Sequence, residues 1–224
     1  RGFADLAAAH GMDVARRMHA IANASVAHLI ETIERHAIAD TGFRRVGALK
    51  CAHSVKAFEH ARHEAEWLTR NLGERGLHVL DRADVRDETG CDSFVGGVLQ
   101  DGAGTIQPLA YARGLARAAV GQGARLHEHS PVTAATRHGG QWVIHTPGGK
   151  LRAKHLLMAT NAYHSPAPPV RLPEVPVVQF YQLATEPLGD NLARDILAGG
   201  EGGWDTGLVM TSLRRDAAGR IILG

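Results

Sequence analysis

The sequence lacks a strong charge of either sign. Its 25 lysines and arginines against 23 aspartates and glutamates leave a net charge of +2 over 224 residues. Without a basic stripe, we expect no nucleic-acid partner. No apolar run approaches the roughly 20 residues of a membrane-spanning helix, so we expect no membrane span. The N-terminal residues RGFADLAAAH also lack the basic segment followed by an apolar stretch that marks a signal peptide.

Cysteine is scarce, because Cys51 and Cys91 are the only two. Two cysteines suit a reducing compartment better than a disulfide scaffold, so we expect a cytoplasmic protein. The sequence also has no GxSxG elbow and no P-loop. It starts at Arg1 and stops at Gly224 inside an apolar strand pattern, and we therefore expect a fragment of a longer protein.

The residues that are present are typical of a globular chain, with 44% apolar and 21% charged residues. A chain of this size can bury roughly 70% of its unfolded surface. Apolar residues spaced by three and four predict a long helix over about 12–38. Its expected apolar stripe consists of Ala15, Met18, Ala22, Val26, Leu29, Ile33 and Ala37.

Local signals predict the remaining elements. Ser54 and Asp81 are placed to cap helices, Gly73 to end one, and Pro108 to begin another. A further short helix is expected near 191–197. The expected strands are 46–51, 77–80, 96–100, 125–128, 132–137, 141–146, 150–155 running into 156–159, 175–178, 181–185, 208–213 and 221–223. A proline-rich break at 166–169 suits a crossing between domains, so the sequence predicts a mixed α and β chain with two interleaved domains.

Several motifs resemble the FAD-dependent amino-acid oxidase family, which includes glycine, sarcosine and D-amino-acid oxidases. The motifs are GTIQP at 104–108, LARAAVGQGARLHEHSPV at 115–132, LLMATNAY at 156–163, ATEPL at 184–188 and GRIILG at 219–224. They occur in the family's order along nearly the whole chain. ATNAY followed by ATEPL is most similar to the γ-glutamylputrescine oxidase-like branch.

The resemblance implies a fold and an activity. We expect an α/β chain in which a partial FAD-binding Rossmann-like domain, 1–42 and 106–172, interleaves with an antiparallel-sheet substrate domain, 43–105 and 173–224. The implied reaction is oxidation of a C–N bond in a small-molecule amine or amino acid, by hydride transfer to flavin N5, followed by hydrolysis of the imine. The family opens with a GxGxxG turn for the FAD pyrophosphate. We find no such turn here, and the glycine cluster at 199–203 lacks its strand–helix context.

The resemblance also implies cofactor-binding residues. Ala159, Thr160 and Asn161 stand at the carboxyl end of an expected buried strand, where nucleotides bind in open sheets. A strand end that simply turns is the alternative. Val132 matches a valine whose main chain contacts the adenine, although a core valine would look the same. Gly224 matches a glycine close to the flavin ring.

Arg214 is the candidate substrate-binding residue. It lies six positions before Arg220, which is the family's spacing, and a guanidinium binds a substrate carboxylate through two parallel hydrogen bonds. A solvated hairpin is the alternative for this arginine. The segment Gly104–Ile106 precedes a helix, and it either lines the flavin pocket or forms a structural turn. No residue stands out as a catalytic acid or base.

Other functions remain open at this point. Cys51, His53, His60 and His63 lack the tight paired spacing of a zinc site, so we expect no metal and scattered surface histidines instead. Two alternatives to an oxidase remain. The chain could be a non-catalytic fragment or interaction domain, or it could bind a small amine or acid without turning it over.

Overall fold

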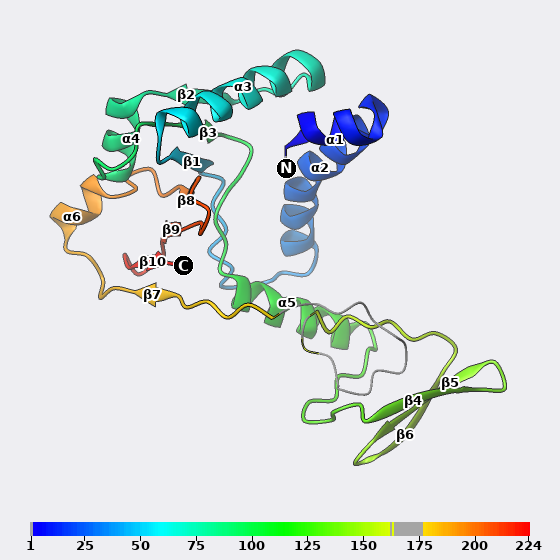
Figure 1. Cartoon of the computed structure of the whole chain (residues 1–224). Helices are drawn as coiled ribbons and strands as arrows, with labels where there is room; N and C mark the ends of the chain where they lie inside the picture. The colour runs from blue at the N-terminus through cyan, green and yellow to red at the C-terminus, as the bar shows by residue number, and fades with distance from the viewer. Residues whose placement is uncertain (1, 162, 164–176) are drawn as a thin grey trace. The chain divides into compact units, whose positions relative to one another are not determined.

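The computed structural model describes residues 2–161, 163 and 177–224. The chain forms two compact units, Arg1–Gly121 with Tyr181–Gly224 and Gln122–Phe180. The first contains a seven-stranded sheet and the second a three-stranded sheet (Figure 1), which confirms the expected mixed α and β fold. Packing does not assign a function to a unit, so the predicted flavin and substrate domains stay a prediction.

The first unit is built on a mixed sheet with the strand order β2-β3-β1-β8-β9-β10-β7. Strands β1 and β8 are parallel, and every other neighbouring pair is antiparallel. The elements of this unit are α1 (Phe3–His10), α2 (Met12–Arg35), β1 (Ala48–Ala52), α3 (Val55–Leu72), β2 (Leu77–Leu80), α4 (Arg82–Thr89), β3 (Gly96–Gln100), α5 (Pro108–Gly121), β7 (Leu183–Ala184), α6 (Asp190–Asp195), β8 (Gly202–Asp205), β9 (Ser212–Arg215) and β10 (Ile221–Leu223).

Two helices pack on the end of the sheet formed by β2, β3 and β1, one helix on each face. Helix α3 packs Ala61 against Val98 of β3, while helix α4 packs Val85 against Leu49 of β1. Val98 pairs with Lys50, the neighbour of Leu49. Because successive side chains in a strand point to opposite faces, the two clusters lie on opposite faces of the sheet. Strands β2, β3 and β1 therefore form a covered half of the sheet.

The predicted helix signals are confirmed. The Ser54 hydroxyl oxygen accepts a hydrogen bond from the Ala57 N–H at 3.3 Å, and Gly73 ends α3 in the left-handed conformation. Asp81 accepts two N–H groups of the first turn of α4, at 2.8 and 3.0 Å, and the Asp84 carboxylate accepts the Asp81 N–H. These side chains satisfy donors that a helix start leaves without partners.

The second unit contains a three-stranded antiparallel meander, as predicted. Its strands are β4 (Ala134–His138), β5 (Gln141–Thr146) and β6 (Gly149–Ala153), and β5 pairs with both neighbours. The turn between β4 and β5 uses Gly139 and Gly140 with φ of 57° and 78°. Positive φ at both positions is what a tight hairpin turn requires.

Two predicted strands are absent, and of a third, 208–213, only residues 212 and 213 lie in a strand, β9. Residues 125–128 and 156–159 are irregular, and neither segment pairs with a strand among the described residues. An apolar run becomes a strand only when neighbouring strands satisfy its backbone groups, and here no described neighbour does so. Of the predicted strand at 175–178, residues 177 and 178 are irregular and the rest lie outside the described residues, as does the proline-rich break at 166–169.

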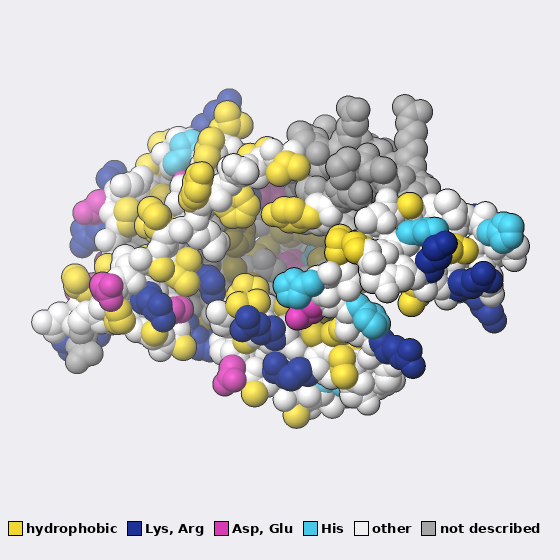
Figure 2. Space-filling model, turned by 90° about the horizontal axis from the view of Figure 1, so that it is seen from below, with side chains coloured by type: hydrophobic (Ala, Val, Ile, Leu, Met, Phe, Trp, Pro, Cys, Tyr) yellow, Lys and Arg dark blue, Asp and Glu magenta, His cyan; other side chains and the backbone are white. Residues whose placement is uncertain are grey.

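The predicted apolar stripe of α2 is only partly buried. Ala15 is buried as expected, but Met18 is 48% exposed, and the adjoining Ile21 is 64% exposed. Apolar side chains also reach the surface elsewhere, as the yellow side chains in Figure 2 show for one face of the molecule. No helix in the described ranges combines the length and apolar character that a membrane crossing needs.

Candidate active site

Beyond β1, the α3 face of the sheet is open. Lys50 pairs with Trp204 of β8, Trp204 pairs with Ser212 of β9, and Ser212 exchanges backbone hydrogen bonds of 2.7 and 3.0 Å with Gly224. Residues directly opposite each other in neighbouring strands share a face, so this row continues the face that α3 covers. No described helix packs extensively on β8, β9, β10 or β7. These four strands form the open half of the sheet.

A cavity of about 250 Å³ lies on the open half, and we call it the sheet cavity. It brings the Gly104–Ile106 segment together with Arg214, which follows Ile106 by 108 positions in the sequence. The remaining lining comes mostly from the strands. The lining residues are Ala48, Gly104, Thr105, Ile106, Gln182, Gly202, Gly203, Trp204, Ser212, Leu213, Arg214 and Ile222.

Arg214 is held in this cavity by a main-chain group. Its Nη1 donates to the Ile106 carbonyl oxygen at 3.2 Å, and among the described residues it has no carboxylate partner. A carbonyl orients the guanidinium without neutralising it. Arg214 therefore keeps both its charge and further donors for an anionic ligand.

Gly104 has a structural role. The N–H of Arg44 donates to the Thr105 carbonyl at 3.0 Å, and the N–H of Thr105 donates to the Arg44 carbonyl at 2.9 Å. A Cβ added at Gly104 would lie 2.3 Å from the Arg44 carbonyl oxygen. This close backbone approach requires glycine, so the segment is a structural bridge that also lines the cavity.

A second cavity of about 230 Å³ adjoins the first at the turn between β9 and β10, and we call it the hairpin cavity. It shares Thr105, Ile106, Arg214 and Ile222 with the sheet cavity. Sequence reasoning missed one of its lining side chains, Arg44. No motif marks that arginine, because its partners lie 156 and 171 positions away along the chain.

The other predicted cofactor-binding residues belong to the second unit. Val132 is 41% exposed, and Ala159 and Thr160 are exposed in irregular chain. Asn161 has a φ of 50°, and the Thr160 carbonyl accepts the Tyr163 N–H at 2.9 Å, which turns the chain. Arg214 and Gly224 belong to the first unit, and the roles of Gly224 and of the residues above in binding FAD stay a prediction.

The residues present fit FAD in part. The backbone of 156–159 makes no hydrogen bond to another described backbone group. On the open half, Gly202 and Gly203 line the sheet cavity without side chains, which suits the approach of a flat ring. The chain supplies no GxGxxG turn for the pyrophosphate.

Cysteine and metal chemistry find no support in the described residues. Burial raises the pKa of the Cys51 thiol to about 12, with smaller contributions from Cys91 and Asp205, and a thiol that stays protonated is a poor nucleophile. The described part of the chain contains no group of three side chains placed to hold a metal ion.

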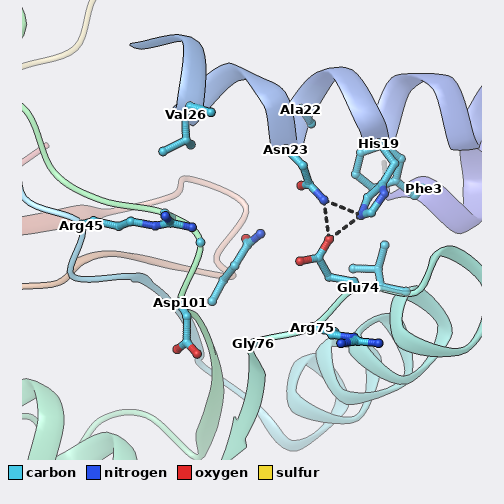
Figure 3. A pocket seen from close by; sticks show the side chains of 15 residues that line it. Phe3, His19, Ala22, Asn23, Val26, Arg45, Glu74, Arg75, Gly76 and Asp101 are labelled. Carbon is cyan, nitrogen blue, oxygen red and sulfur yellow. Dashed lines mark hydrogen bonds and ion pairs between the residues drawn. The ribbon is translucent and has the colours of Figure 1, made fainter. Parts of the chain in front are cut away.

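A larger cavity, of about 680 Å³, lies elsewhere in the first unit and is lined by none of the predicted site residues. In Figure 3, the Glu74 side chain points toward His19 and Asn23, which line the same cavity. Glu74 Oε2 lies 2.5 Å from His19 Nε2 and accepts the Asn23 amide at 2.8 Å. These bonds attach α2 to the segment after α3, and we assign them a structural role.

Solved structures with the same fold include a glycine oxidase and an L-proline dehydrogenase. Glycine oxidase from Geobacillus kaustophilus superimposes with a TM-score of 0.69 at 18% identity, covering 95% of this chain and 54% of that one. L-Proline dehydrogenase from P. horikoshii gives 0.70 at 14% identity, covering 90% and 54%.

The sequence shows the family of the chain. Residues 2–224 match the family described as FAD dependent oxidoreductase, and the chain belongs to that family. A probable oxidoreductase OrdL of Rhizobium meliloti is 29% identical over 96% of this chain and 49% of its own length. Gamma-glutamylputrescine oxidoreductase of Escherichia coli is 27% identical over 96% and 50%. The chain thus spans about half the length of these relatives, and the resemblance found in the sequence, with FAD as the family's cofactor, is confirmed.

Proposed function

We propose that the protein containing this chain oxidises a C–N bond of an amine or amino acid with FAD. When bound, FAD supplies the acceptor for a hydride from the carbon beside the substrate nitrogen. The imine product hydrolyses in water to a carbonyl compound and ammonia or a smaller amine. The observation that carries the proposal is Arg214, a guanidinium without a described carboxylate partner in a cavity on the open half of the sheet.

Arg214 binds the substrate carboxylate in this proposal. Ile106 fixes the guanidinium from one side, and two parallel hydrogen bonds to a carboxylate would set the direction of the substrate carbon. Apolar side chains of Ile106, Trp204 and Ile222 line the same cavity and limit water. We assign Val132, Ala159, Thr160, Asn161 and Gly224 to FAD.

The described lining of the sheet cavity offers no side chain that readily takes up a proton. Its described lining has no carboxylate, histidine, lysine or tyrosine side chain. A substrate amine would therefore have to enter in its neutral form, because no side chain there can remove its proton. We expect kcat/KM to rise with pH until the amine in solution is deprotonated.

The test uses the full-length protein with its flavin. Anaerobic addition of amines and α-amino acids should bleach the visible absorbance of the flavin, and hydrogen peroxide should appear on turnover if oxygen is the acceptor. Failure of every amine and amino acid to bleach the flavin would overturn the proposal. Saturable binding without bleaching would instead identify a binding protein.

A matched pair of variants tests the role of Arg214. Arg214→Met should lower kcat/KM for an α-amino acid by about tenfold to a hundredfold, the loss expected for hydrogen bonds to a charged group. Arg86→Met is the control, because Arg86 lies on α4, has a side chain that is 59% exposed and lines neither cavity. Equal losses in the two variants would remove Arg214 from the substrate site.

A further inference from the structure

The hairpin cavity carries an excess of positive charge. Four arginines line it, Arg44, Arg214, Arg215 and Arg220, together with Asp40 and Asp216. Asp216 is already engaged, because it pairs with Arg220 and accepts the backbone N–H groups of residues 218 and 220 at 2.8 and 3.0 Å. The formal charge of the lining is therefore positive, and exposed Asp40 is its one other carboxylate among the described residues.

Arg44 is fixed at this cavity by main-chain carbonyls. Its Nη2 donates to the carbonyl oxygens of Gly200, at 3.4 Å, and Arg215, at 3.2 Å. A Cβ added at Gly200 would lie 2.7 Å from Arg44 Nη1, so the guanidinium packs directly on that glycine. The backbone of Arg44 is bridged to Thr105 as well. The guanidinium is thus held in position before any ligand arrives.

No described side chain forms an ion pair that balances the charge of Arg44. Arg44 is half-buried and has no ion pair with a described residue. Partly buried charges are normally paired, and main-chain carbonyls accept hydrogen bonds without cancelling the charge. An arginine that is fixed, charged and open to a cavity is suited to a planar anion such as a carboxylate.

We propose that the hairpin cavity is a second anion subsite, which binds a carboxylate on the part of the substrate remote from the oxidised carbon. This inference rests on the proposed function, because the hairpin cavity shares Arg214 and Ile106 with the sheet cavity. The preferred substrates are then amines or amino acids that carry an additional, distal carboxylate. Arg44 is the specificity residue and Arg214 lies between the two subsites.

The test compares substrates that differ only in a terminal carboxylate. With the full-length, flavin-containing protein, kcat/KM is measured for straight-chain amines against ω-aminocarboxylates of equal length. Neutral α-amino acids are compared with α-amino dicarboxylic acids in the same way. We expect the carboxylate member to be preferred by about tenfold or more. Arg44→Met should abolish this preference and leave the neutral member within about twofold. Arg86→Met, on α4 and outside both cavities, should retain it.

A measurement without turnover separates this inference from the proposed function. Glutarate, titrated calorimetrically into the same protein, should bind, and Arg44→Met should weaken it by about tenfold or more. Arg44→Lys keeps the positive charge but loses the paired donors of the guanidinium, so its affinity for glutarate should lie between those of wild type and Arg44→Met. Thermal unfolding verifies that each variant is folded. Turnover of neutral amines without a carboxylate preference that depends on Arg44 would overturn the subsite and leave the oxidase intact. Binding of sulfate but not glutarate would show a site for inorganic anions only, and would also overturn it.

Discussion

The two halves of the seven-stranded sheet differ in what lies on them. The covered half has α3 on one face and α4 on the other, and Leu49, Cys51 and Val85 are at most 1% exposed there. The open half has no extensive helix packing among the described elements, and it carries both cavities and their arginines. Stability is thus concentrated in one half of the sheet and binding groups in the other, within one continuous ladder of strands.

The largest effect should come from the core of the covered half. Leu49→Ala should reduce the free energy of unfolding by about 2–5 kcal/mol, because it removes a fully buried side chain and leaves a cavity. Urea unfolding measures this loss. Leu208→Ala is the matched control, since Leu208 is fully exposed and should change stability by less than about 0.5 kcal/mol. Similar losses of unfolding free energy in both variants would contradict the assignment of the stabilising core to the covered half.

Cys51 should make the covered half sensitive to alkaline pH. Its pKa is raised from 9.0 to about 12 by burial, so above pH 9 the unfolded chain loses a proton that the folded chain retains. Stability is fully present below pH 9 and should fall by about 1.4 kcal/mol per pH unit between pH 9 and 12. The free energy of unfolding, measured against pH for wild type and Cys51→Ala, should fall more steeply with pH in wild type. Parallel curves for the two proteins would refute the role of Cys51.

The cap of α4 should have a smaller effect. Asp81→Ala removes the acceptor of two first-turn N–H groups and should cost about 1 kcal/mol of unfolding free energy. Asp81→Asn retains an acceptor and should lose less. If the alanine and asparagine variants unfold at the same urea concentration, the cap does not stabilise α4.

The smallest effect is expected where the two halves meet. Lys50 Nζ lies 2.7 Å from Glu64 Oε2, with side chains 28% and 22% exposed. A double-mutant cycle with Lys50→Met and Glu64→Gln should give a coupling of about 1 kcal/mol or less, and salt should reduce it. A coupling above about 2 kcal/mol would show that the stabilising, covered half of the sheet extends beyond β1.

Local signals in the sequence predicted most of the helices and the meander. A cap such as Ser54, or a pair of glycines such as Gly139 and Gly140, acts through neighbours two to four residues away, so its effect can be read from the sequence. Strand pairing is different. The segment 156–159 has the composition of a buried strand, but composition does not show whether a partner strand is present beside it.

In the candidate site, too, local sequence reveals one residue and only the fold reveals the other. Arg214 was found through its fixed distance from Arg220 in a family motif, and its contact with Ile106 then appeared only in the structure. Arg44 could not be found in this way. Its significance depends on carbonyls of Gly200 and Arg215, which the fold brings to it from far along the chain.

Filling the sheet cavity tests the central claim that the open half is the substrate face. Ser212 lines this cavity, and Ser212→Phe should place a ring where the substrate binds. In the full-length, flavin-containing protein, kcat/KM for the preferred amine should fall by at least about tenfold, with thermal unfolding unchanged and with Leu208→Phe equal to wild type. A folded Ser212→Phe variant with wild-type kcat/KM would show that the substrate binds elsewhere.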